Sequence, residues 1–380
     1  MKISTLVKNF SIKMFSLLPL QNKVVLENFN GRGMGDDPKY IALALLEKRL
    51  EKIKLIWLCN DTKASYPKGI TPVKYKSLRS LYELSTAKVW VYNTKGGFKI
   101  PKRKGQYYIQ TWHASMGLKK IEKDGNLSPV YQRYLEKDAA MTDLMYGNND
   151  FYVKLYKERF WYNGPVLKTS VPRMSPLLNE KKRLCLNDKV RAFYGLRKDE
   201  KIVLYAPTFR NTNDLSIYQF DYDKLIKAAD QRFGGKHVLL LRLHPKIAEK
   251  KGLLLNGKAV IQASDYPDMQ ELLAATDLLI SDYSSSVFDF AATEKPVLLY
   301  TPDLDEYLNN DRGLYFQPSE WPFPIAKSVA ELCGLIASFD IQEYKRRFFE
   351  FYEKIGYSDD GNGDVAIADI VLENLGLSKN

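Results

Sequence analysis

Two of the three histidines in this sequence stand where a short apolar run ends, and imidazole at such a place suits acid–base chemistry. His113 lies in QTWHASMGLKK after the run YYIQ, and His244 lies in VLLLRLHP. Histidine is the side chain best suited to take a proton near neutral pH. His113 is therefore either a general base or a histidine that is buried by Trp112 and hydrogen-bonded to the backbone. His237 stands at the start of a run, and we assign it no role.

Cationic side chains accompany both histidines. Lys119 and Lys120 follow His113 and suit an anionic substrate. Arg242 precedes His244 by two residues, so the two side chains share one face of a strand. Either this pair grips a diphosphate, or Arg242 belongs to a structural ion pair.

Residues 279–300, LISDYSSSVFDFAATEKPVLLY, contain a turn with three consecutive hydroxyl groups. An apolar run ends at Asp282, Ser284, Ser285 and Ser286 follow, and apolar residues then recur at helical spacing. A helix that opens here at the carboxyl edge of a parallel sheet presents N–H groups and a dipole that attract phosphate. The alternative is an ordinary serine N-cap on a packing helix.

Further polar residues follow two other apolar runs. Thr208 and Arg210 lie in YAPTFR after the run KIVLY, and Arg312 lies in RGLYF some way after the run VLLY. Arginine is a good partner for phosphate oxygens. We therefore add these three residues and Asp282 to the candidate substrate-binding set.

The elements that must position these residues alternate between short apolar runs and longer amphipathic segments. The runs lie at residues 23–27, 55–58, 89–92, 107–110, 141–146, 202–206, 238–243, 260–262, 278–281 and 297–300. This alternation predicts an α/β fold with parallel sheets flanked by helices. A chain of 380 residues suggests two domains, which we place at residues 23–185 and 186–380. Two such domains would face each other across a cleft lined by strand ends.

Composition restricts the function. A net charge of +12 implies an anionic partner such as nucleic acid, a phospholipid surface or a phosphorylated substrate. Three widely separated cysteines form neither a disulfide framework nor a zinc site, and a reducing compartment fits. We find no metal-ligand cluster, and the early NGRGMGD loop lacks the spacing of a dinucleotide site. The basic run at residues 95–104 is either a solvated loop or a surface for an anionic membrane or acceptor.

Residues 1–22 form a basic segment with lysines, apolar residues and no acid. It is either an amphipathic helix that lies in a membrane interface or a first helix packed on the body. No segment reaches the roughly 18 apolar residues of a membrane span.

Together these motifs resemble the CDP-glycerol glycerophosphotransferases of bacterial teichoic acid synthesis. The matching pieces, spread over about residues 107–316, are QTWHASMGLKK, FWYNGPVLKTSVPR, YAPTFR, LRLHP, SDYSSSVFDF, KPVLLYTPDLDEY and RGLYF. The resemblance implies a GT-B arrangement of two Rossmann-like domains, with CDP-glycerol held mainly by the C-terminal one. It implies His113 as the catalytic base, His244 near the diphosphate, and Ser284 and Ser285 as substrate-binding hydroxyls.

The resemblance also implies the reaction. The hydroxyl of an undecaprenyl-diphosphate-linked saccharide attacks the β-phosphorus of CDP-glycerol, His113 takes the proton, and CMP leaves. Our own hypothesis adds that His244, Arg242, Arg210, Arg312 and the serine turn would hold the phosphates. CDP-glycerol is a substrate, and we expect no cofactor and no metal. We expect a peripheral enzyme on the cytoplasmic face of the membrane, with no nucleic acid partner.

Two departures from the family pattern bear on these expectations. WHASMGLK is one residue longer than the WHGTPLK of many polymerases and looks more like the primases. Ser175 stands where the family usually has an aspartate after the PR motif. Ribitol phosphate, a polymerising activity, a capsule acceptor and a nucleotide-sugar glycosyltransferase on the same fold remain alternatives.

Overall fold

The chain divides into two compact units that are each discontinuous in sequence. The computed structural model describes residues 5–48, 52–95, 97–125, 127–210, 216–218, 220–243, 259–310 and 313–377. Unit 1 contains residues 1–113, 122–175 and 358–380, and unit 2 contains residues 114–121 and 176–357. The chain therefore passes between the units after residues 113, 121, 175 and 357. The predicted division at residue 185 falls inside helix α7 (Glu180–Tyr194), whereas the crossings between the units lie elsewhere.

Unit 1 is built on a parallel five-stranded sheet in the order β3-β2-β1-β4-β5. Its strands are β1 (Gln21–Glu27), β2 (Lys54–Cys59), β3 (Ile70–Lys74), β4 (Ala87–Tyr92) and β5 (Tyr107–Gln110), and β6 (Met145–Gly147) pairs separately with β7 (Val166–Lys168). Its helices are α1 (Thr5–Phe15), α2 (Asp36–Glu47), α3 (Leu78–Thr86), α4 (Pro129–Met141), α5 (Asp150–Arg159) and α14 (Gly363–Leu375). The central strand β1 is buried from Lys23 onward, as expected for a sheet covered on both faces.

Unit 2 is built on a parallel six-stranded sheet in the order β10-β9-β8-β11-β12-β13. Its strands are β8 (Glu200–Tyr205), β9 (Lys236–Leu241), β10 (Val260–Gln262), β11 (Leu278–Ser281), β12 (Val297–Tyr300) and β13 (Ile325–Ala326). Helix α6 (Ser175–Leu178) begins at the crossing into this unit, and the other helices are α7, α8 (Tyr222–Phe233), α9 (Met269–Ala275), α10 (Ser286–Ala291), α11 (Leu304–Asn310), α12 (Val329–Ala337) and α13 (Ile341–Lys354). The predicted α/β alternation is therefore present in both units.

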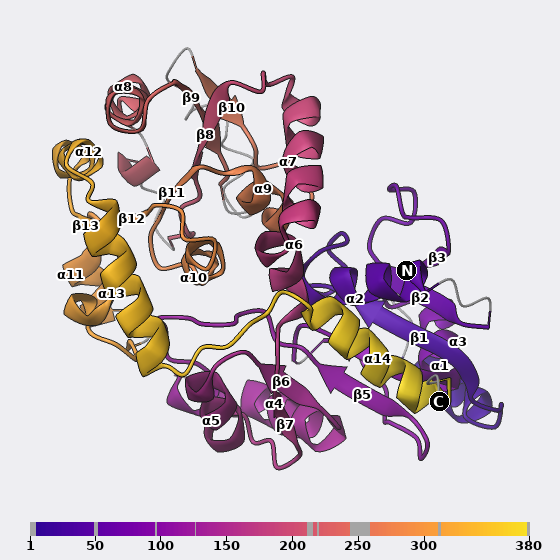
Figure 1. Cartoon of the computed structure of the whole chain (residues 1–380). Helices are drawn as coiled ribbons and strands as arrows, with labels where there is room; N and C mark the ends of the chain where they lie inside the picture. Colours follow the sequence, from indigo (N-terminus) through magenta and orange to yellow (C-terminus); the bar gives the residue numbers. More distant parts are fainter. Residues whose placement is uncertain are drawn as a thin grey trace. The chain divides into compact units, whose positions relative to one another are not determined.

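The last helix, α14, belongs to unit 1 although it ends the chain. In Figure 1 this yellow helix runs among the indigo and purple elements of unit 1, and it packs against α2. The buried Ser175 hydroxyl accepts a hydrogen bond from the backbone N–H of Asp364 (3.1 Å), in the first turn of α14. The serine at this departure from the family pattern thus satisfies one of the free donors at a helix start.

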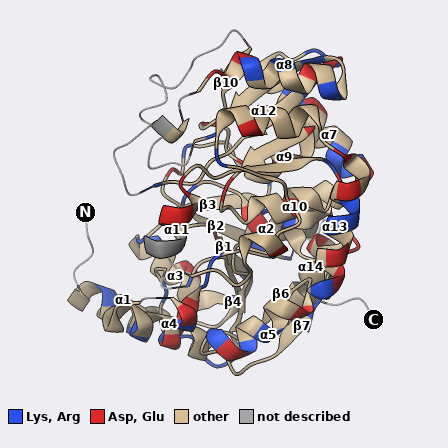
Figure 2. Cartoon of the chain, turned by 90° about the vertical axis from the view of Figure 1, so that its left-hand side faces the viewer, with Lys and Arg blue, Asp and Glu red and all other residues tan. Residues whose placement is uncertain are grey.

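Helix α1 turns apolar side chains outward. Ile12 and Phe15 pack against the core of unit 1, whereas Leu6 is 84% exposed and Phe10 is 67% exposed. The helix carries Lys8 and Lys13 and no acidic residue, as Figure 2 shows along its length. In the part of the chain that the structure describes, no helix is both long enough and apolar enough to cross a membrane.

Most cations of the basic run at residues 95–104 are paired with groups of unit 1, whereas Lys104 is exposed. Lys95 pairs with Glu122 and Lys99 pairs with Asp138, and all four side chains are buried. Lys102 pairs with Asp143, and Arg103 donates to the backbone carbonyls of Ser85 and Leu18. The paired cations therefore hold the loop against the rest of unit 1. Because carboxylates and carbonyls of the protein already contact them, they are poorly placed to bind an external anion.

Candidate active site

Strand β5 delivers His113 through a strained backbone. The strand ends at Gln110, whose side-chain oxygen accepts a hydrogen bond from the backbone N–H of Trp112 (2.9 Å). Trp112 has a φ of 56°, in the left-handed region that a bulky side chain rarely adopts. Such conformations persist where the surrounding structure fixes them, and they concentrate at functional sites.

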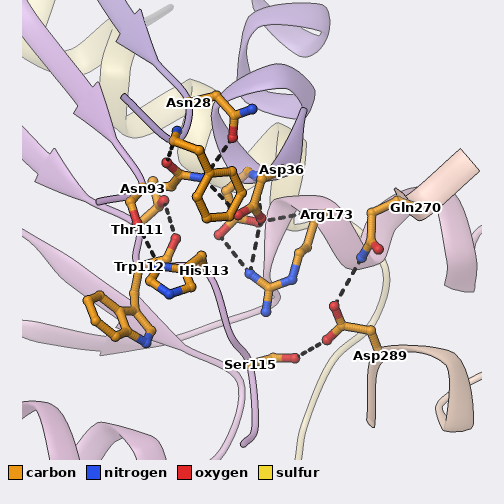
Figure 3. Close-up of polar contacts among 12 residues, drawn as sticks. Asn28, Asp36, Asn93, Thr111, Trp112, His113, Ser115, Arg173, Gln270 and Asp289 are labelled. Atoms are coloured by element: carbon orange, nitrogen blue, oxygen red, sulfur yellow. Dashed lines mark hydrogen bonds and ion pairs between the residues drawn. The ribbon is translucent and has the colours of Figure 1, made fainter. Parts of the chain in front are cut away.

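The His113 ring has a defined orientation (Figure 3). Its Nδ1 lies 3.0 Å from the backbone carbonyl oxygen of Asn93. Because a carbonyl only accepts hydrogen bonds, Nδ1 carries the proton, and Nε2 of the neutral ring has the free lone pair. The Trp112 ring lies 4.2 Å from the His113 ring and the Phe29 ring lies 5.4 Å from it, centroid to centroid. The arrangement presents Nε2 as a proton acceptor.

The pKa of His113 lies below its ordinary value. Burial is the main cause, because it disfavours the charged ring. The hydrogen bond to Asn93 and the charge of Asp36 act in the opposite direction, and the charge of Arg173 adds to the lowering. His113 is therefore neutral at pH 7, which is the state that a general base requires.

A buried polar network lies behind His113. Arg173 contacts the carboxylates of Asp36 (3.3 Å) and Asp37 (3.5 Å), and its backbone N–H donates to Asp37 (2.9 Å). Burial raises the pKa of Asp37 to about 8. Asp36 in turn accepts a hydrogen bond from the side chain of Asn93 (2.8 Å). We did not single out any of these residues from the sequence, although NGRGMGD and VPR both contain members of the network.

In unit 2 the three serines open helix α10, as predicted. Ser284 Oγ lies 2.8 Å from Ser286 Oγ and accepts a hydrogen bond from the Ser286 backbone N–H (3.3 Å). Ser285 occupies the N-cap position, and its side chain makes no capping bond. The three residues are half-buried, so a ligand can reach their hydroxyls. Because α10 has only six residues, these hydroxyls rather than a long helix dipole must supply any attraction for phosphate.

Thr208, Arg210 and Asp282 form one network at the carboxyl ends of β8 and β11. Both Asp282 oxygens accept from the Thr208 backbone N–H (3.0 Å), and one contacts the Arg210 guanidinium (2.9 Å). Asp303 holds the same guanidinium from the other side and accepts from the Tyr283 hydroxyl (3.1 Å). Burial alone would lower the pKa of Arg210, but the two carboxylates raise it overall. The Arg210 charge is therefore already balanced within the protein.

Lys119 and Lys120 lie in the segment that joins unit 2 directly after His113. Lys120 donates its backbone N–H to Gly313 (2.7 Å), and Lys119 pairs with Leu314 in an antiparallel bridge. The Lys119 ammonium lies 4.9 Å from the ring centroid of Tyr307, which stacks at 3.6 Å on Tyr283, the neighbour of the serine turn. The pieces GLKK, GLYF, DLDEY and SDYSSS thus meet within one unit.

A second contact anchors the same segment. The buried Ser115 hydroxyl donates to Asp289 of α10, and Gln270 of α9 donates to the other oxygen of this carboxylate (3.1 Å; Figure 3). The segment that follows the histidine is therefore fixed to the helix that follows the serine turn.

Of the remaining predicted site residues, the structure describes Arg242. The Arg242 guanidinium donates to the backbone carbonyls of Ala263 (3.1 Å) and Tyr266 (2.7 Å), so it holds the segment after β10. His237, to which we assigned no role, is buried and contacts Asp230 (2.8 Å). His244 and Arg312 lie outside the described residues. Within the described ranges, no group of three or more His, Cys, Asp or Glu residues is arranged to hold a metal ion.

Comparison with known sequences identifies the family of this chain. The model of the family described as CDP-glycerol:poly(glycerophosphate) glycerophosphotransferase matches residues 10–373. The chain belongs to this family. The family prediction is therefore confirmed, and so is the prediction of a transferase of this class.

Two relatives show how the match extends. The chain is 30% identical over 375 residues to the teichoic acid poly(glycerol phosphate) polymerase of Bacillus subtilis (strain 168), covering 95% of this chain and 50% of that protein. It is 28% identical over 386 residues to the protein of the same name from Bacillus spizizenii, covering 97% of both. The chain thus spans about half of the first relative and nearly all of the second. Proteins named glycerol-phosphate primase and ribitol-phosphate polymerase also match.

A solved structure confirms the fold class. The wall teichoic acid polymerase TagF, in a histidine-to-alanine variant, aligns with a TM-score of 0.85 and 27% identity over 97% of this chain and 94% of that chain. TagF has also been solved as a histidine-to-asparagine variant soaked with CDPG. The two Rossmann-like units are those of a GT-B enzyme.

Proposed function

We propose that this enzyme transfers glycerol phosphate from CDP-glycerol to a hydroxyl of a lipid-linked saccharide in teichoic acid synthesis, with His113 as the general base. The orientation of the His113 ring carries this proposal, because Nδ1 is committed to a carbonyl and Nε2 is left to accept a proton. Family membership supports the donor, and the CDPG soak of TagF supports it further.

The reaction is a phosphoryl transfer at the β-phosphorus. The acceptor oxygen forms a bond to this phosphorus, the bond to the bridging oxygen breaks, and CMP leaves with that oxygen. The acceptor proton goes to Nε2 of His113. Alignment and charge stabilisation supply most of the rate in such transfers.

The residues proposed to hold the phosphates lie mostly in unit 2. Ser284, Ser285 and Ser286 offer hydroxyls, and Lys119 and Lys120 offer charge. His244 and Arg312 stay in the proposed set on the family resemblance alone. Arg210 and Arg242 act through the loops that they hold, because their guanidinium groups already bind carboxylates and carbonyls.

Helix α1 supports a site of action at the membrane and, with it, a lipid-linked acceptor. Its outward apolar face, with Leu6 and Phe10 largely exposed, suits the interface of an anionic membrane, and Lys8 and Lys13 suit the lipid charge. A membrane-bound enzyme would reach an undecaprenyl-diphosphate-linked saccharide on the cytoplasmic face.

The direct test measures CMP release from CDP-glycerol by the purified full chain, with and without a lipid-linked disaccharide analogue, followed by mass spectrometry of the lipid. Acceptor-dependent CMP and a lipid heavier by glycerol phosphate support the proposal. One added unit indicates a primase, and a ladder indicates a polymerase. Turnover with CDP-ribitol or a UDP-sugar, but not with CDP-glycerol, rules the donor out.

Membrane association is tested separately by flotation with phosphatidylglycerol vesicles and with phosphatidylcholine vesicles. We expect the chain to float with the anionic vesicles and Phe10→Ser to reduce the bound fraction several-fold. Leu184→Ser is the matched control, because Leu184 is 58% exposed on α7 in unit 2. Equal loss in both variants, or none in Phe10→Ser, argues against α1 as the anchor.

A further inference from the structure

The carbonyl that orients His113 is itself held in place. It belongs to Asn93, which follows strand β4, and every polar atom of the Asn93 side chain is used. Its NH₂ group donates to Asn28 (2.8 Å) and to Asp36 (2.8 Å), and its oxygen accepts from the backbone N–H of Phe29 (2.9 Å). Asn93 is fully buried, and these three bonds fix the peptide that His113 contacts.

Asp36 is the charged member of this arrangement. One of its oxygens accepts from Asn93, and the other accepts from the backbone N–H of Asp37 (2.9 Å) and contacts Arg173 (3.3 Å). Asp36 has a φ of 55°, and its side chain is 10% exposed. Phe29, which also bonds to Asn93, has a φ of 42°. The loop between β1 and α2 therefore adopts costly backbone conformations around the residues that position Asn93.

We propose that Asp36 is a positioning residue for His113 and acts through Asn93. This inference rests on the proposed role of His113 as the base. Asp36 touches neither substrate nor the reacting atoms in this arrangement. It fixes the Asn93 side chain, the Asn93 carbonyl fixes the proton on Nδ1, and Nε2 remains the basic nitrogen.

The arrangement differs from a triad in which a carboxylate binds the imidazole directly. Here a peptide carbonyl stands between them, so the carboxylate sets the geometry indirectly and its charge acts at longer range. When Nε2 takes the acceptor proton, the ring becomes positive, and the negative charge of Asp36 stabilises it. The charged groups that act on His113 are Asp36, which raises its pKa, and Arg173, which lowers it.

The first variant removes the charge. Asp36→Asn keeps a residue that tolerates the left-handed backbone, but it leaves Arg173 to act on His113 with less compensation. We expect the pKa of His113 to fall, so the acidic limb of the kcat profile moves to lower pH. At neutral pH we expect kcat to fall about 10-fold, with KM for CDP-glycerol unchanged.

The second variant removes the tether. Asn93→Ala retains the backbone carbonyl and the charge of Asp36 but frees the peptide. We expect both neutral tautomers of His113 in ¹H–¹⁵N spectra of the histidine-labelled full chain, and a fall in kcat of about 10- to 100-fold. His113→Gln assigns the signals. Asp138→Asn is the matched control, because Asp138 is a buried carboxylate of unit 1 whose side chain contacts Lys99 and Tyr108.

The proposal requires both results. It is overturned if Asp36→Asn leaves the His113 pKa and the acidic limb unchanged, or if Asn93→Ala keeps one Nδ1–H tautomer. It is also overturned if the wild-type spectrum places the proton on Nε2, a result that holds even where a variant fails to fold. Absence of turnover in the wild type would instead count against the proposed function. The tautomer measurement needs no substrate, so it tests the role of Asp36 independently of turnover.

Discussion

The surroundings of His113 in unit 1 and the serine turn in unit 2 use charge in opposite ways. Around His113, buried charged and amide groups together fix the orientation of the imidazole ring. The arrangement leaves Nε2 as the nitrogen that would accept a proton. Around the serine turn, Asp282 and Asp303 take up the charge of Arg210, and the serine hydroxyls are half-buried.

The two proposed tasks make different demands on the residues around each site. A base must be held in one orientation and one protonation state, so its neighbours are fixed and dehydrated. A phosphate site must admit and release a nucleotide, so the groups that bind it must be accessible. The nearby buried charges, such as that of Arg210, can meanwhile be neutralised by residues of the protein itself. Substitutions in unit 1 should therefore change kcat, and substitutions of the accessible groups in unit 2 should change the affinity for CDP-glycerol.

The largest effect is expected at His113. His113→Gln should lower kcat about 10²–10⁴-fold, because a positioned base contributes that much, and should leave CDP-glycerol affinity nearly unchanged. Calorimetric titration and CMP release measure the two quantities. His237→Gln is the matched control, since His237 is a histidine bonded to Asp230 away from any proposed step. Near-normal turnover in His113→Gln would refute the assignment of the base.

Arg210 tests whether the unit 2 charges are structural. Arg210→Met leaves Asp282 and Asp303 uncompensated in a largely buried position, which should reduce the free energy of unfolding by about 3–5 kcal/mol. Denaturant unfolding measures this loss, and adding Asp303→Asn should recover part of it. If Arg210→Met instead keeps full stability and loses only CDP-glycerol affinity, Arg210 binds the phosphates directly.

Arg210 also shows what the sequence could not provide. Its place after β8 was predictable, but its carboxylate partners lie far along the chain, and Asp303 is separated from it by 93 residues. A cation at the end of a strand predicts an anion-binding site. Whether its charge can bind a ligand depends on the carboxylates and carbonyls that contact it in the folded protein. The same holds for Arg242, whose carbonyl partners follow β10.

The fold was predictable where the pattern is local. Strands β5, β10, β11 and β12 coincide with the predicted apolar runs, because each is a short apolar segment between turn residues; β11 and β12 are fully buried, and β10 is half-buried. Strand β3 was missed because Pro72 interrupts it, and proline is tolerated there since β3 is an edge strand. The return of α14 to unit 1 depends on contacts across most of the chain, which no local pattern records.

The candidate site divides in the same way. His113, Lys119 and the serine turn were named from residue type and place. Asp36 and Asn93 were not, because they reach the histidine through contacts between segments 57 residues apart. A signal was present in the loop NGRGMGD, whose glycines and closing aspartate mark a constrained turn after a strand.

Lys119 tests whether the accessible groups of unit 2 determine the affinity for CDP-glycerol. Lys119→Gln should raise KM for CDP-glycerol about 10-fold with little change in kcat, because one charge near the phosphates is lost. The increase should shrink at high salt, which screens the wild-type attraction. Lys123→Gln is the matched control, since Lys123 also lies over an aromatic ring, 5.5 Å from Trp161, but in unit 1. A fall in kcat alone would place Lys119 with the catalytic groups rather than with the binding groups.

The smallest effects separate two neighbouring hydroxyls. Ser284 Oγ already accepts from the Ser286 backbone, so Ser284→Ala should lower stability by about 1 kcal/mol. Ser285 makes no side-chain capping bond, so Ser285→Ala should leave thermal unfolding unchanged and weaken CDP-glycerol binding about 3- to 10-fold. Titration calorimetry and thermal unfolding of both variants test this division. If Ser285→Ala binds CDP-glycerol as the wild type does, the turn is a helix cap, and the affinity of unit 2 must come from its lysines.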